Sequence, residues 1–292
     1  MILILGKNGQ VGGALAALLA DTGVAFDSSE INLIQPDFID KLSVLFQQHD
    51  FTAIINAAAY TQVDRAEDER ELAMRINGHA VGELAAWCKK HDVTLVHYST
   101  DYVFDGSGSH AHKEEEPVAP LSVYGESKLL GEQLIAASGA EHLIFRTSWV
   151  YDGAGKNFFN TMRRLFKERE ELGVVADQVG APTYAPHLAG ATLAALGHAQ
   201  CMEHFPSGIY HLCGGGETSW HGFASMILAL ASAYESGIKC QRVKSILTSE
   251  YPTRAVRPLN SRLDCGKANN ILNVRLPGWE DALKECYESI GL

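Results

Sequence analysis

A tyrosine and a lysine near the middle of the chain have the spacing needed for acid–base chemistry. Tyr124 and Lys128 are four residues apart, so a helix would place both side chains on one face. An ammonium group beside a phenol favours the phenolate and lowers the pKa of the phenol, which would make Tyr124 a competent proton donor to a carbonyl group. Thr100, at the end of an apolar run, could donate a hydrogen bond to the same carbonyl oxygen. This set of residues therefore indicates chemistry at a carbonyl.

Three glycines near the N-terminus could bind a pyrophosphate. Gly6, Gly9 and Gly12 follow the apolar run 2–5 and open the helical pattern 11–19. Glycines let the backbone turn tightly, and the free N–H groups at a helix N-terminus bind a pyrophosphate. A glycine-rich turn can also be no more than a turn. Its position after the first strand of an alternating pattern favours a dinucleotide-binding site.

An aspartate at the end of the second apolar run could select the nicotinamide coenzyme. Asp27 lies 21 residues after Gly6, where an acidic side chain accepts hydrogen bonds from the adenosine ribose and favours NADH over NADPH. The alternative is an ordinary loop aspartate. No arginine follows Asp27, but Lys7 could meet the additional phosphate of NADPH. The choice between NADH and NADPH therefore stays open.

The elements that must position these residues alternate between short apolar runs and helical patterns. Strands are predicted at 2–5, 24–26, 53–56, 94–99 and 143–146, with further strands of the same kind at 172–175 and 208–212. Helices are predicted at 11–19, 38–49, 65–91 and 124–137. This alternation predicts an α/β fold, a Rossmann-like doubly wound parallel sheet with helices on both faces.

The alternation loosens after about residue 150, where stretches rich in Gly, Pro and polar residues follow. We therefore expect an NAD(P)-binding domain at 1–150, to which later strands from about 172–215 return. Residues 151–292 would form mainly a smaller, interleaved C-terminal lobe that binds the substrate.

Composition and charge exclude several classes of protein. Of the 292 residues, 24 are basic and 35 acidic, and the net charge of −11 argues against a nucleic-acid partner. The sequence shows neither a run of about 18 apolar residues nor a secretory signal, so we expect no membrane partner and a cytoplasmic location. The six cysteines are scattered singly, which is typical of reduced thiols rather than a disulfide framework or zinc site. The histidines are interpreted as structural, with His110 and His112 in an exposed loop, and no metal is predicted.

Longer motifs relate the chain to one group of enzymes. The sequence resembles the extended short-chain dehydrogenases/reductases and, among them, the dTDP-4-dehydrorhamnose reductase family. The resemblance covers nearly the whole chain and rests on GKNGQVG at 6–12, NAAAYTQVDRAE at 56–67, VHYSTDYVFDG at 96–106, VYGESKLLGE at 123–132, IFRTSWVY at 144–151, DQVGAPT at 177–183 and YPTRAVRPLNSRLD at 251–264.

The resemblance implies a reaction and a role for each residue of the site. Hydride transfer from NADPH or NADH would reduce C4 of dTDP-4-dehydro-L-rhamnose to give dTDP-L-rhamnose. Tyr124 would give a proton to the C4 oxygen, and Lys128 would tune Tyr124 and hold the nicotinamide ribose. Thr100 would orient the C4 oxygen, with Asp101 supporting the site and Trp149 packing against the sugar.

The implied coenzyme contacts come mainly from the start of the chain. They are Gly6, Gly9, Gln10, Val11, Gly12, Asp27, Asn32, Leu33, Ala57, Ala58 and Ala59, together with Tyr124 and Lys128. Some family members bind Mg²⁺ through a glutamate two residues after the last glycine of the turn, but this chain has Ala14 there, so no such metal is expected. Arg257, with Arg254, could bind the diphosphate of the sugar nucleotide or be a surface residue. A homodimer is also left open.

Two other functions remain open from the sequence. A non-catalytic binding subunit, similar to the regulatory beta subunit of methionine adenosyltransferase, would keep the fold without the reaction. A reductase or epimerase acting on another 4-keto sugar nucleotide would keep the chemistry with another substrate. A dehydratase is disfavoured, because Tyr102 stands where a glutamate would be expected after Thr100 and Asp101.

Overall fold

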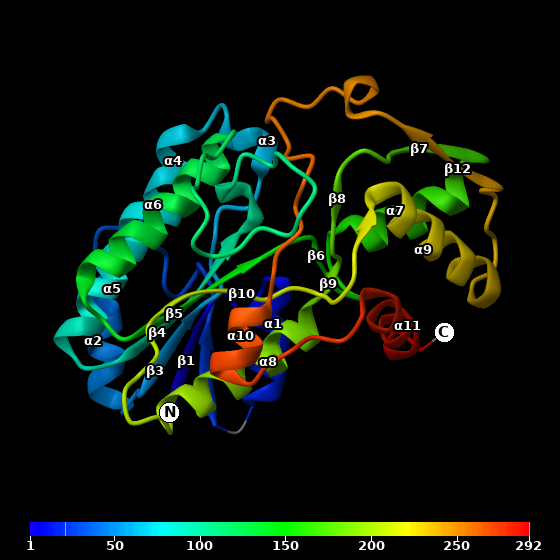
Figure 1. Ribbon diagram of the computed structural model, residues 1–292. Coiled ribbons are helices and arrows are strands. Elements are labelled where there is room, and N and C mark those ends of the chain that lie inside the picture. Colours follow the sequence, from blue (N-terminus) through cyan, green and yellow to red (C-terminus); the bar gives the residue numbers. More distant parts are fainter. Residues whose placement is uncertain (21, 292) are drawn as a thin grey trace.

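A six-stranded parallel sheet forms the centre of the structure, a computed structural model that describes residues 1–20 and 22–291 (Figure 1). Its strands are β1 (Ile2–Leu5), β2 (Gly23–Phe26), β3 (Ala53–Asn56), β4 (Thr94–Thr100), β5 (His142–Thr147) and β10 (Gly208–His211). They lie in the order β10-β5-β4-β3-β1-β2, and neighbouring strands are parallel. The winding reverses between β1 and β3, and ligands of open parallel sheets bind at such a point. The predicted α/β, doubly wound fold is confirmed.

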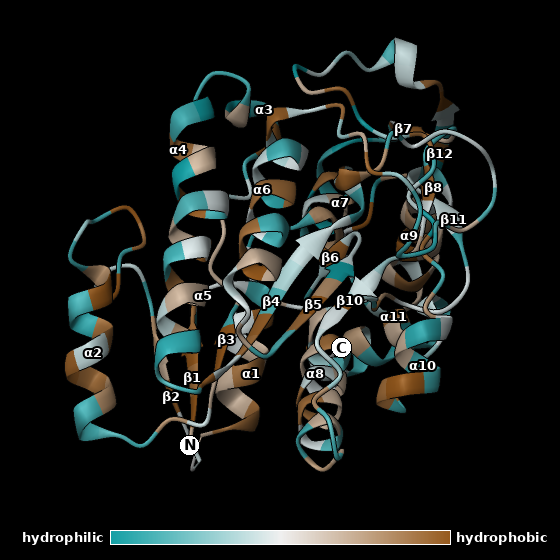
Figure 2. Cartoon of the chain, turned by 60° about the vertical axis from the view of Figure 1, so that its left-hand side comes forward, coloured by the Kyte–Doolittle hydropathy of each residue, from teal (hydrophilic) through white to brown (hydrophobic). Residues whose placement is uncertain are grey.

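Helices cover both faces of this sheet (Figure 2). One face carries α2 (Phe38–Gln48), α5 (Ala80–Lys90) and α6 (Val123–Ser138), and the other carries α1 (Gln10–Leu18), α8 (Ala185–Gln200) and α10 (Gly266–Leu272). Strands β3, β4 and β5 are buried along their whole length. Because both faces of these strands are covered, the sequence shows continuous apolar runs there instead of alternation.

The helix predicted over 65–91 is wrong as a single element. The chain there forms α3 (Val63–Ala66), α4 (Arg70–Met74), a π-helical turn η1 (Arg75–His79) and α5. In the π-helical turn, the Asn77 amide donates a hydrogen bond to the Ser127 hydroxyl in α6, at 3.0 Å. Gly78 lies so close to α6 that a Cβ atom there would approach the Leu130 side chain to 2.5 Å. The helix therefore widens where it fits against α6, which the 3.6-residue periodicity does not reveal.

A smaller lobe, built from the second half of the chain, lies beside the main sheet (Figure 1). Its strand pairs are β6 (Val150–Tyr151) with β9 (Thr183–Tyr184), β7 (Glu171–Val175) with β12 (Arg242–Ile246), and β8 (Val179–Gly180) with β11 (Thr218–Ser219). Its helices are α7 (Phe158–Glu168), α9 (Trp220–Tyr234) and α11 (Trp279–Ser289). Aromatic side chains such as Tyr151, Phe159 and Phe223 form its core. Across the described part of the chain, no helix has the length and apolar character needed to cross a membrane.

The strand predicted at 172–175 exists but does not join the main sheet. As β7 it pairs with β12, whereas the strand predicted at 208–212 joins the main sheet as β10 beside β5. β7 has exposed residues between buried ones, so one of its faces is open to solvent. Its buried residues Leu172 and Val174 pack into the core of the smaller lobe. The prediction that this strand returns to the main sheet is therefore wrong, while the domain division at residue 150 stays a prediction.

A buried ion pair fixes α6 to the sheet. Arg146 in β5 donates from Nε and Nη2 to the two carboxylate oxygens of Glu132 in α6, at 2.9 and 2.7 Å. The exposed fractions of the two side chains are 3% and 2%. The Ser99 hydroxyl in β4 donates to the same carboxylate. This two-point contact sets both the position and the rotation of the helix that carries Tyr124 and Lys128.

Removing the Glu132 carboxylate should strongly destabilise the fold. In Glu132→Ala the Arg146 charge stays buried without its partner, and we expect the free energy of unfolding to fall by about 3–5 kcal/mol. The matched control is Glu168→Ala, which breaks the exposed Arg164–Glu168 pair and should change the free energy of unfolding by less than about 1 kcal/mol. Urea unfolding followed by circular dichroism measures both variants. Equal losses would contradict a special role for the buried pair.

Candidate active site

The four predicted catalytic residues lie where β4 ends and α6 begins. Thr100 is the last residue of β4, and Asp101 begins the short 3₁₀ turn η2 (Asp101–Val103). Tyr124 and Lys128 lie in the first two turns of α6. Because β4 is a central strand, its carboxyl end opens at the edge of the sheet where ligands of this fold bind.

The start of α6 is packed tightly against the turn after β4. The Ser122 hydroxyl accepts a hydrogen bond from the Gly125 N–H at 3.2 Å, which caps the helix. A Cβ atom on Gly125 would lie 2.2 Å from the Tyr102 carbonyl oxygen, so only glycine allows this approach. The rings of Tyr102 and Tyr124 then meet edge to face, with their centroids 5.6 Å apart. The absence of a side chain at position 125 thus sets the distance between Tyr124 and the end of β4.

Thr100 connects the phenol of Tyr124 to the carboxyl group of Asp101. The Thr100 hydroxyl donates to Asp101 Oδ1 at 3.0 Å and also lies beside the Tyr124 phenol. Burial raises the pKa of Tyr124 well above its usual range, and the hydrogen bond with Thr100 opposes this increase only in part. Phenol, hydroxyl and carboxyl group therefore lie next to one another in that order, with the hydroxyl bonded to the carboxyl group.

The Asp101 carboxyl group is buried and has one unpaired oxygen. The residue is 3% exposed, and Oδ2 has no hydrogen-bond partner among the described residues. Burial raises the pKa of Asp101 to about 6, although hydrogen bonds with Ser261 and Thr100 oppose the increase. A carboxyl group with this pKa can hold or release a proton near neutral pH.

Lys128 contacts a buried histidine. Its Nζ lies 3.1 Å from Nε2 of His97. Burial lowers the pKa of Lys128 to about 8 and lowers the pKa of His97 well below its usual range. The prediction that Lys128 lowers the pKa of Tyr124 is wrong for this structure, because desolvation raises the phenol pKa and Lys128 is directed at His97.

His97 and Asn56 are functional candidates that the sequence analysis misses, since it interprets His97 as structural. The Asn56 amide nitrogen lies 3.1 Å from His97 Nδ1, and Asn56 Oδ1 accepts the Ala58 N–H. With Asn56 donating to Nδ1, the neutral ring carries its proton on Nε2, the nitrogen that faces Lys128. The sequence signal that could have identified them is one polar residue in each of two apolar strands. The register between β3 and β4 pairs these two residues directly.

The glycine-rich turn leaves no room for side chains. Gly6 has a φ of +91°, in the left-handed region that favours glycine. A Cβ atom on Gly12 would lie 2.0 Å from the Gly6 carbonyl oxygen, and Gly9 is the N-cap of α1. The start of α1 therefore presents backbone N–H groups close to the end of β1. These residues fit a coenzyme pyrophosphate, which such N–H groups would hold.

Two acidic side chains lie at the end of β2. Asp27 accepts hydrogen bonds from the N–H and hydroxyl of Ser29 and from the Asn8 amide, which lower its pKa. Lys7 Nζ lies 2.6 Å from Glu30 Oε2, and Glu30 also accepts the Asp27 N–H. The Lys7 charge, which could meet the additional phosphate of NADPH, is therefore paired. The pairing favours NADH at this position.

The three alanines after β3 lie against the glycine-rich turn. A Cβ atom on Gly6 would lie 2.7 Å from the Ala58 nitrogen. Ala57 and Val11 pack against the same core cluster. Ala57 and Ala58 are thus placed beside the start of α1, and the coenzyme roles of Ala57, Ala58 and Ala59 stay predictions.

The remaining predicted coenzyme residues are held by other contacts. Gln10 Nε2 donates to the Val150 carbonyl oxygen at 3.3 Å, which joins α1 to the smaller lobe. Leu33 is only 5% exposed and packs in the core beside α2. The Asn32 side chain accepts the Ile34 N–H at 3.0 Å. Asn32, which is half-buried, is therefore the more accessible of the two residues predicted at the adenine.

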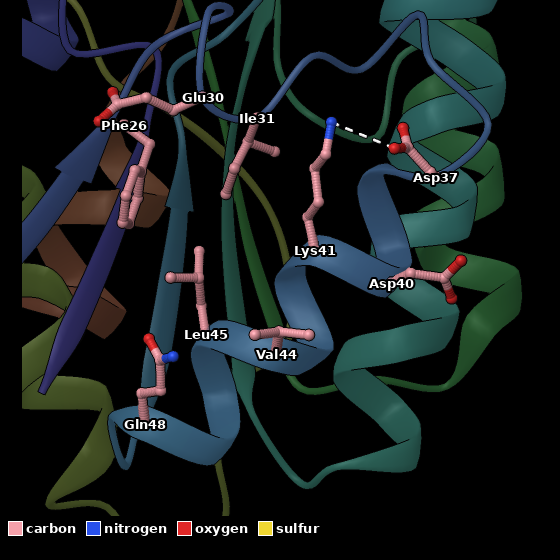
Figure 3. Close-up of a pocket in the computed structure, with 9 residues that line it drawn as sticks. All are labelled: Phe26, Glu30, Ile31, Asp37, Asp40, Lys41, Val44, Leu45 and Gln48. Atoms are coloured by element: carbon pink, nitrogen blue, oxygen red, sulfur yellow. Dashed lines mark ion pairs between the residues drawn. The ribbon is translucent and has the colours of Figure 1, made fainter.

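A groove of about 460 Å³ lies between the end of β2 and α2 (Figure 3). Apolar side chains such as Phe26 and Leu45 line it together with charged ones, including Lys41, whose Nζ lies 3.2 Å from Asp37 Oδ2. Glu30 is part of its lining, but the predicted catalytic residues are not. The groove therefore adjoins the coenzyme-selecting end of β2, and the chemistry belongs to the end of β4.

The predicted sugar contacts are engaged with neighbouring residues. Trp149 has a φ of +48°, and its ring stacks on Trp220 with the centroids 3.8 Å apart. Arg257 donates from Nη2 to Asp64 at 2.9 Å and from Nη1 to the Tyr102 hydroxyl at 3.4 Å. Arg257 thus contacts the tyrosine that packs on Tyr124, but an acidic side chain pairs its charge.

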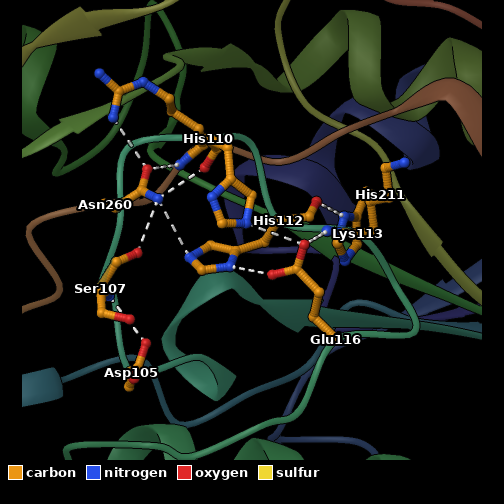
Figure 4. A network of polar contacts seen from close by, with 9 residues as sticks. Asp105, Ser107, His110, His112, Lys113, Glu116, His211 and Asn260 are labelled. Carbon is orange, nitrogen blue, oxygen red and sulfur yellow. Dashed lines mark hydrogen bonds and ion pairs between the residues drawn. The ribbon is translucent and has the colours of Figure 1, made fainter.

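The loop after β4 contains a buried histidine (Figure 4). The prediction that His112 is exposed is wrong: it is 4% exposed, its ring stacks on Phe104 at 4.4 Å, and Nδ1 lies 2.8 Å from Glu116 Oε2. His110 is exposed, as predicted. His110, His112 and Glu116 offer ligand atoms within 4.8 Å of one another, a grouping that the sequence analysis does not consider. Both ring nitrogens of His112 already contact Glu116 and Asn260.

Comparison with known proteins identifies the family. The family described as RmlD substrate binding domain matches residues 1–291. The chain is 44% identical to dTDP-4-dehydrorhamnose reductase of Burkholderia thailandensis, over 99% of this chain and 98% of that protein. It is 42% identical to the Escherichia coli K12 enzyme of the same name, over 99% and 97%. The chain belongs to the dTDP-4-dehydrorhamnose reductase family.

Solved structures of this family share the fold. The dTDP-4-dehydrorhamnose reductase of Clostridium acetobutylicum has a TM-score of 0.90 at 33% identity, covering 100% of this chain and 99% of that one. The Bacillus anthracis enzyme, solved in complex with NADP, has a TM-score of 0.88 at 34% identity, covering 99% and 98%. These likenesses confirm the predicted family, the fold class and the NAD(P)H-dependent oxidoreductase function. The roles of individual residues and a homodimer stay predictions.

Releasing Lys7 from Glu30 should shift the coenzyme preference. In Glu30→Gln the Lys7 ammonium group becomes free to meet a 2′-phosphate, and we expect the ratio of kcat/KM for NADPH to that for NADH to rise about tenfold, or about 1.4 kcal/mol. Calorimetric binding of 2′,5′-ADP against 5′-ADP should shift in the same direction. Asp40→Asn, a charge-matched change on α2, should leave both ratios unchanged. If Lys7→Gln in the Glu30→Gln background keeps the shift, Lys7 is not responsible.

Proposed function

We propose that the chain reduces the C4 keto group of dTDP-4-dehydro-L-rhamnose to give dTDP-L-rhamnose, with NADH or NADPH as reductant. The observation that carries this proposal is the arrangement of Tyr124, Thr100 and Asp101 side by side at the carboxyl edge of a dinucleotide-binding sheet. Membership in the reductase family supports the substrate class.

Tyr124, Thr100 and Asp101 each have a part in the proton transfer. The bound nicotinamide coenzyme supplies the hydride that C4 receives. Tyr124 gives its proton to the C4 oxygen, while Thr100 donates a hydrogen bond to the developing alkoxide. The phenolate then regains a proton from Thr100, which takes one from the Asp101 carboxylic acid, and solvent recharges Asp101. Lys128 would hold the nicotinamide ribose.

The smaller lobe would supply the sugar-nucleotide contacts. Trp149 presents an indole fixed by its stack on Trp220, which suits one face of a sugar ring. Arg257 could exchange Asp64 for a substrate diphosphate, since both are anionic acceptors. Tyr102 packs on Tyr124 where a dehydratase would carry a glutamate, which favours reduction over dehydration. We also propose the division into a coenzyme domain at 1–150 and a mainly substrate-binding lobe at 151–292.

Tyr124→Phe should abolish turnover and leave coenzyme binding intact. The variant lacks the proton for the C4 oxygen, and we expect kcat to fall by about 10²–10⁴ with a dTDP-4-keto-6-deoxy-L-sugar as substrate. NADH consumption measures the rate, and NADH fluorescence measures binding. Tyr234→Phe, at an exposed position of α9, should retain full turnover. Full turnover in Tyr124→Phe would overturn the assigned chemistry.

Asp101→Asn should stabilise the protein at neutral pH while lowering its activity. The folded-state pKa of Asp101, about 6, lies above its usual value of 3.8, so the neutral acid stabilises the fold below pH 3.8 and this stability is lost as the pH rises through 6. Asn does not ionise, so we expect a gain on the order of 3 kcal/mol at pH 7.5 that vanishes below pH 4. Urea unfolding at both pH values measures this difference. An equal effect at pH 4 and pH 7.5 would show that ionisation of Asp101 is not the cause.

A further inference from the structure

Two thiols from distant parts of the sequence meet beside the proposed active site. Cys213, just after β10, and Cys265, just before α10, have their Sγ atoms 3.6 Å apart although 52 residues separate them. The sequence analysis treats all six cysteines as isolated thiols. This contact is therefore a feature that only the fold reveals.

The two thiols differ in their exposure. Cys213 is 5% exposed and belongs to a small apolar cluster with Val103, Phe104 and Leu263. Cys265 lies at the edge of this cluster and is partly exposed. A small oxidant can therefore reach Cys265 first, with Cys213 held behind it.

The backbone holds both residues in place. The N–H of Leu212 donates to the Arg146 carbonyl oxygen at 2.9 Å, and the N–H of Gly214 donates to the Thr183 hydroxyl at 3.1 Å, so the residues on either side of Cys213 are fixed. The carbonyl oxygen of Cys265 accepts the Asn269 N–H of α10 at 3.1 Å. The contact between the thiols therefore does not depend on a mobile loop, and side-chain rotation can bring the sulfurs toward the roughly 2.05 Å of a disulfide bond.

We propose that Cys213 and Cys265 are a redox-active pair, which a hydroperoxide converts into an intramolecular disulfide. The Cys265 thiolate attacks one peroxide oxygen, the O–O bond breaks, and with a proton from solvent the products are a sulfenic acid and water. Cys213 sulfur then attacks the Cys265 sulfur, the S–O bond breaks, and the thiol proton leaves with the hydroxide as a second water. Two thiols are oxidised by two electrons and one hydrogen peroxide molecule is reduced to two waters.

The contact itself prepares this reaction. The contact between the two sulfurs lowers the pKa of Cys265, while the same contact and burial raise the pKa of Cys213. Cys265 is thus the attacking thiolate and Cys213 the resolving thiol.

The disulfide would act on the neighbourhood of Asp101. It would join the end of β10 to the segment before α10, and that segment also carries Ser261, which lies beside Asp101 and lowers its pKa. We expect the oxidised protein to unfold at a Tm several degrees higher than the reduced protein, and dithiothreitol to reverse the change.

The experiment treats the full-length protein with stoichiometric hydrogen peroxide, blocks free thiols in denaturant and analyses the peptides by mass spectrometry. We expect a linked peptide joining Cys213 and Cys265, with the number of titratable thiols falling from six to four. In Cys213→Ser, the sulfenic acid on Cys265 should persist and react with dimedone. The matched control Cys201→Ser, which removes an exposed isolated thiol, should still form the linked peptide.

The covalent readout does not depend on turnover, so its result is separate from that of the proposed reductase activity. Oxidation confined to Cys201, or the absence of the linked peptide in a wild-type protein whose thiols have been oxidised, would overturn the proposal. If Cys213→Ser fails to fold, Cys265→Ala in an otherwise native chain tests the same step. In that variant, peroxide must leave Cys213 reduced and the Tm of the protein unchanged.

Discussion

The position of the proposed active site depends on the buried Glu132–Arg146 ion pair. A carboxylate and a guanidinium group removed from water must satisfy one another, so α6 has one permitted position on β4 and β5. Tyr124 precedes Glu132 by eight residues, about 12 Å along the helix, which brings its phenol to the end of β4. Ser99 donates to Glu132, and Thr100, its neighbour in sequence, bonds to Asp101. One ion pair thus aligns both sides of the site.

Two glycines of α6 that pack directly against backbone atoms complete this alignment. A Cβ atom on Gly131 would lie 2.3 Å from the Asn77 carbonyl oxygen, and one on Gly125 would lie 2.2 Å from the Tyr102 carbonyl oxygen. α6 therefore rests on backbone at two places, the π-helical turn and the turn after β4. Because neither contact can absorb an added methyl group, a substitution at either glycine would displace Tyr124.

The sequence predicts those features that depend on local pattern. Buried parallel strands appear in the sequence as apolar runs. Tyr124 and Lys128, four residues apart, both lie in α6 as predicted, because helical periodicity is local. Features that depend on pairing between distant segments could not be predicted in this way. Lys128 contacts His97, whose position depends on the register between β4 and β3, where His97 pairs with Asn56. The strand β7 lies outside the main sheet because it pairs with β12. The Cys213–Cys265 contact could not be predicted for the same reason.

Desolvation has the same effect on each ionisable group in the proposed site. Burial raises the pKa of Asp101 and of Tyr124 and lowers that of Lys128, so each shift favours the uncharged form. The pKa values of Asp101 and Lys128, about 6 and about 8, are thereby brought close to neutrality, where each group can gain or lose a proton. The net charge of −11 also gives no attraction for an anionic sugar nucleotide or coenzyme. Their diphosphates must therefore be recognised locally, by backbone N–H groups at the start of α1 and by arginines that exchange one anion for another.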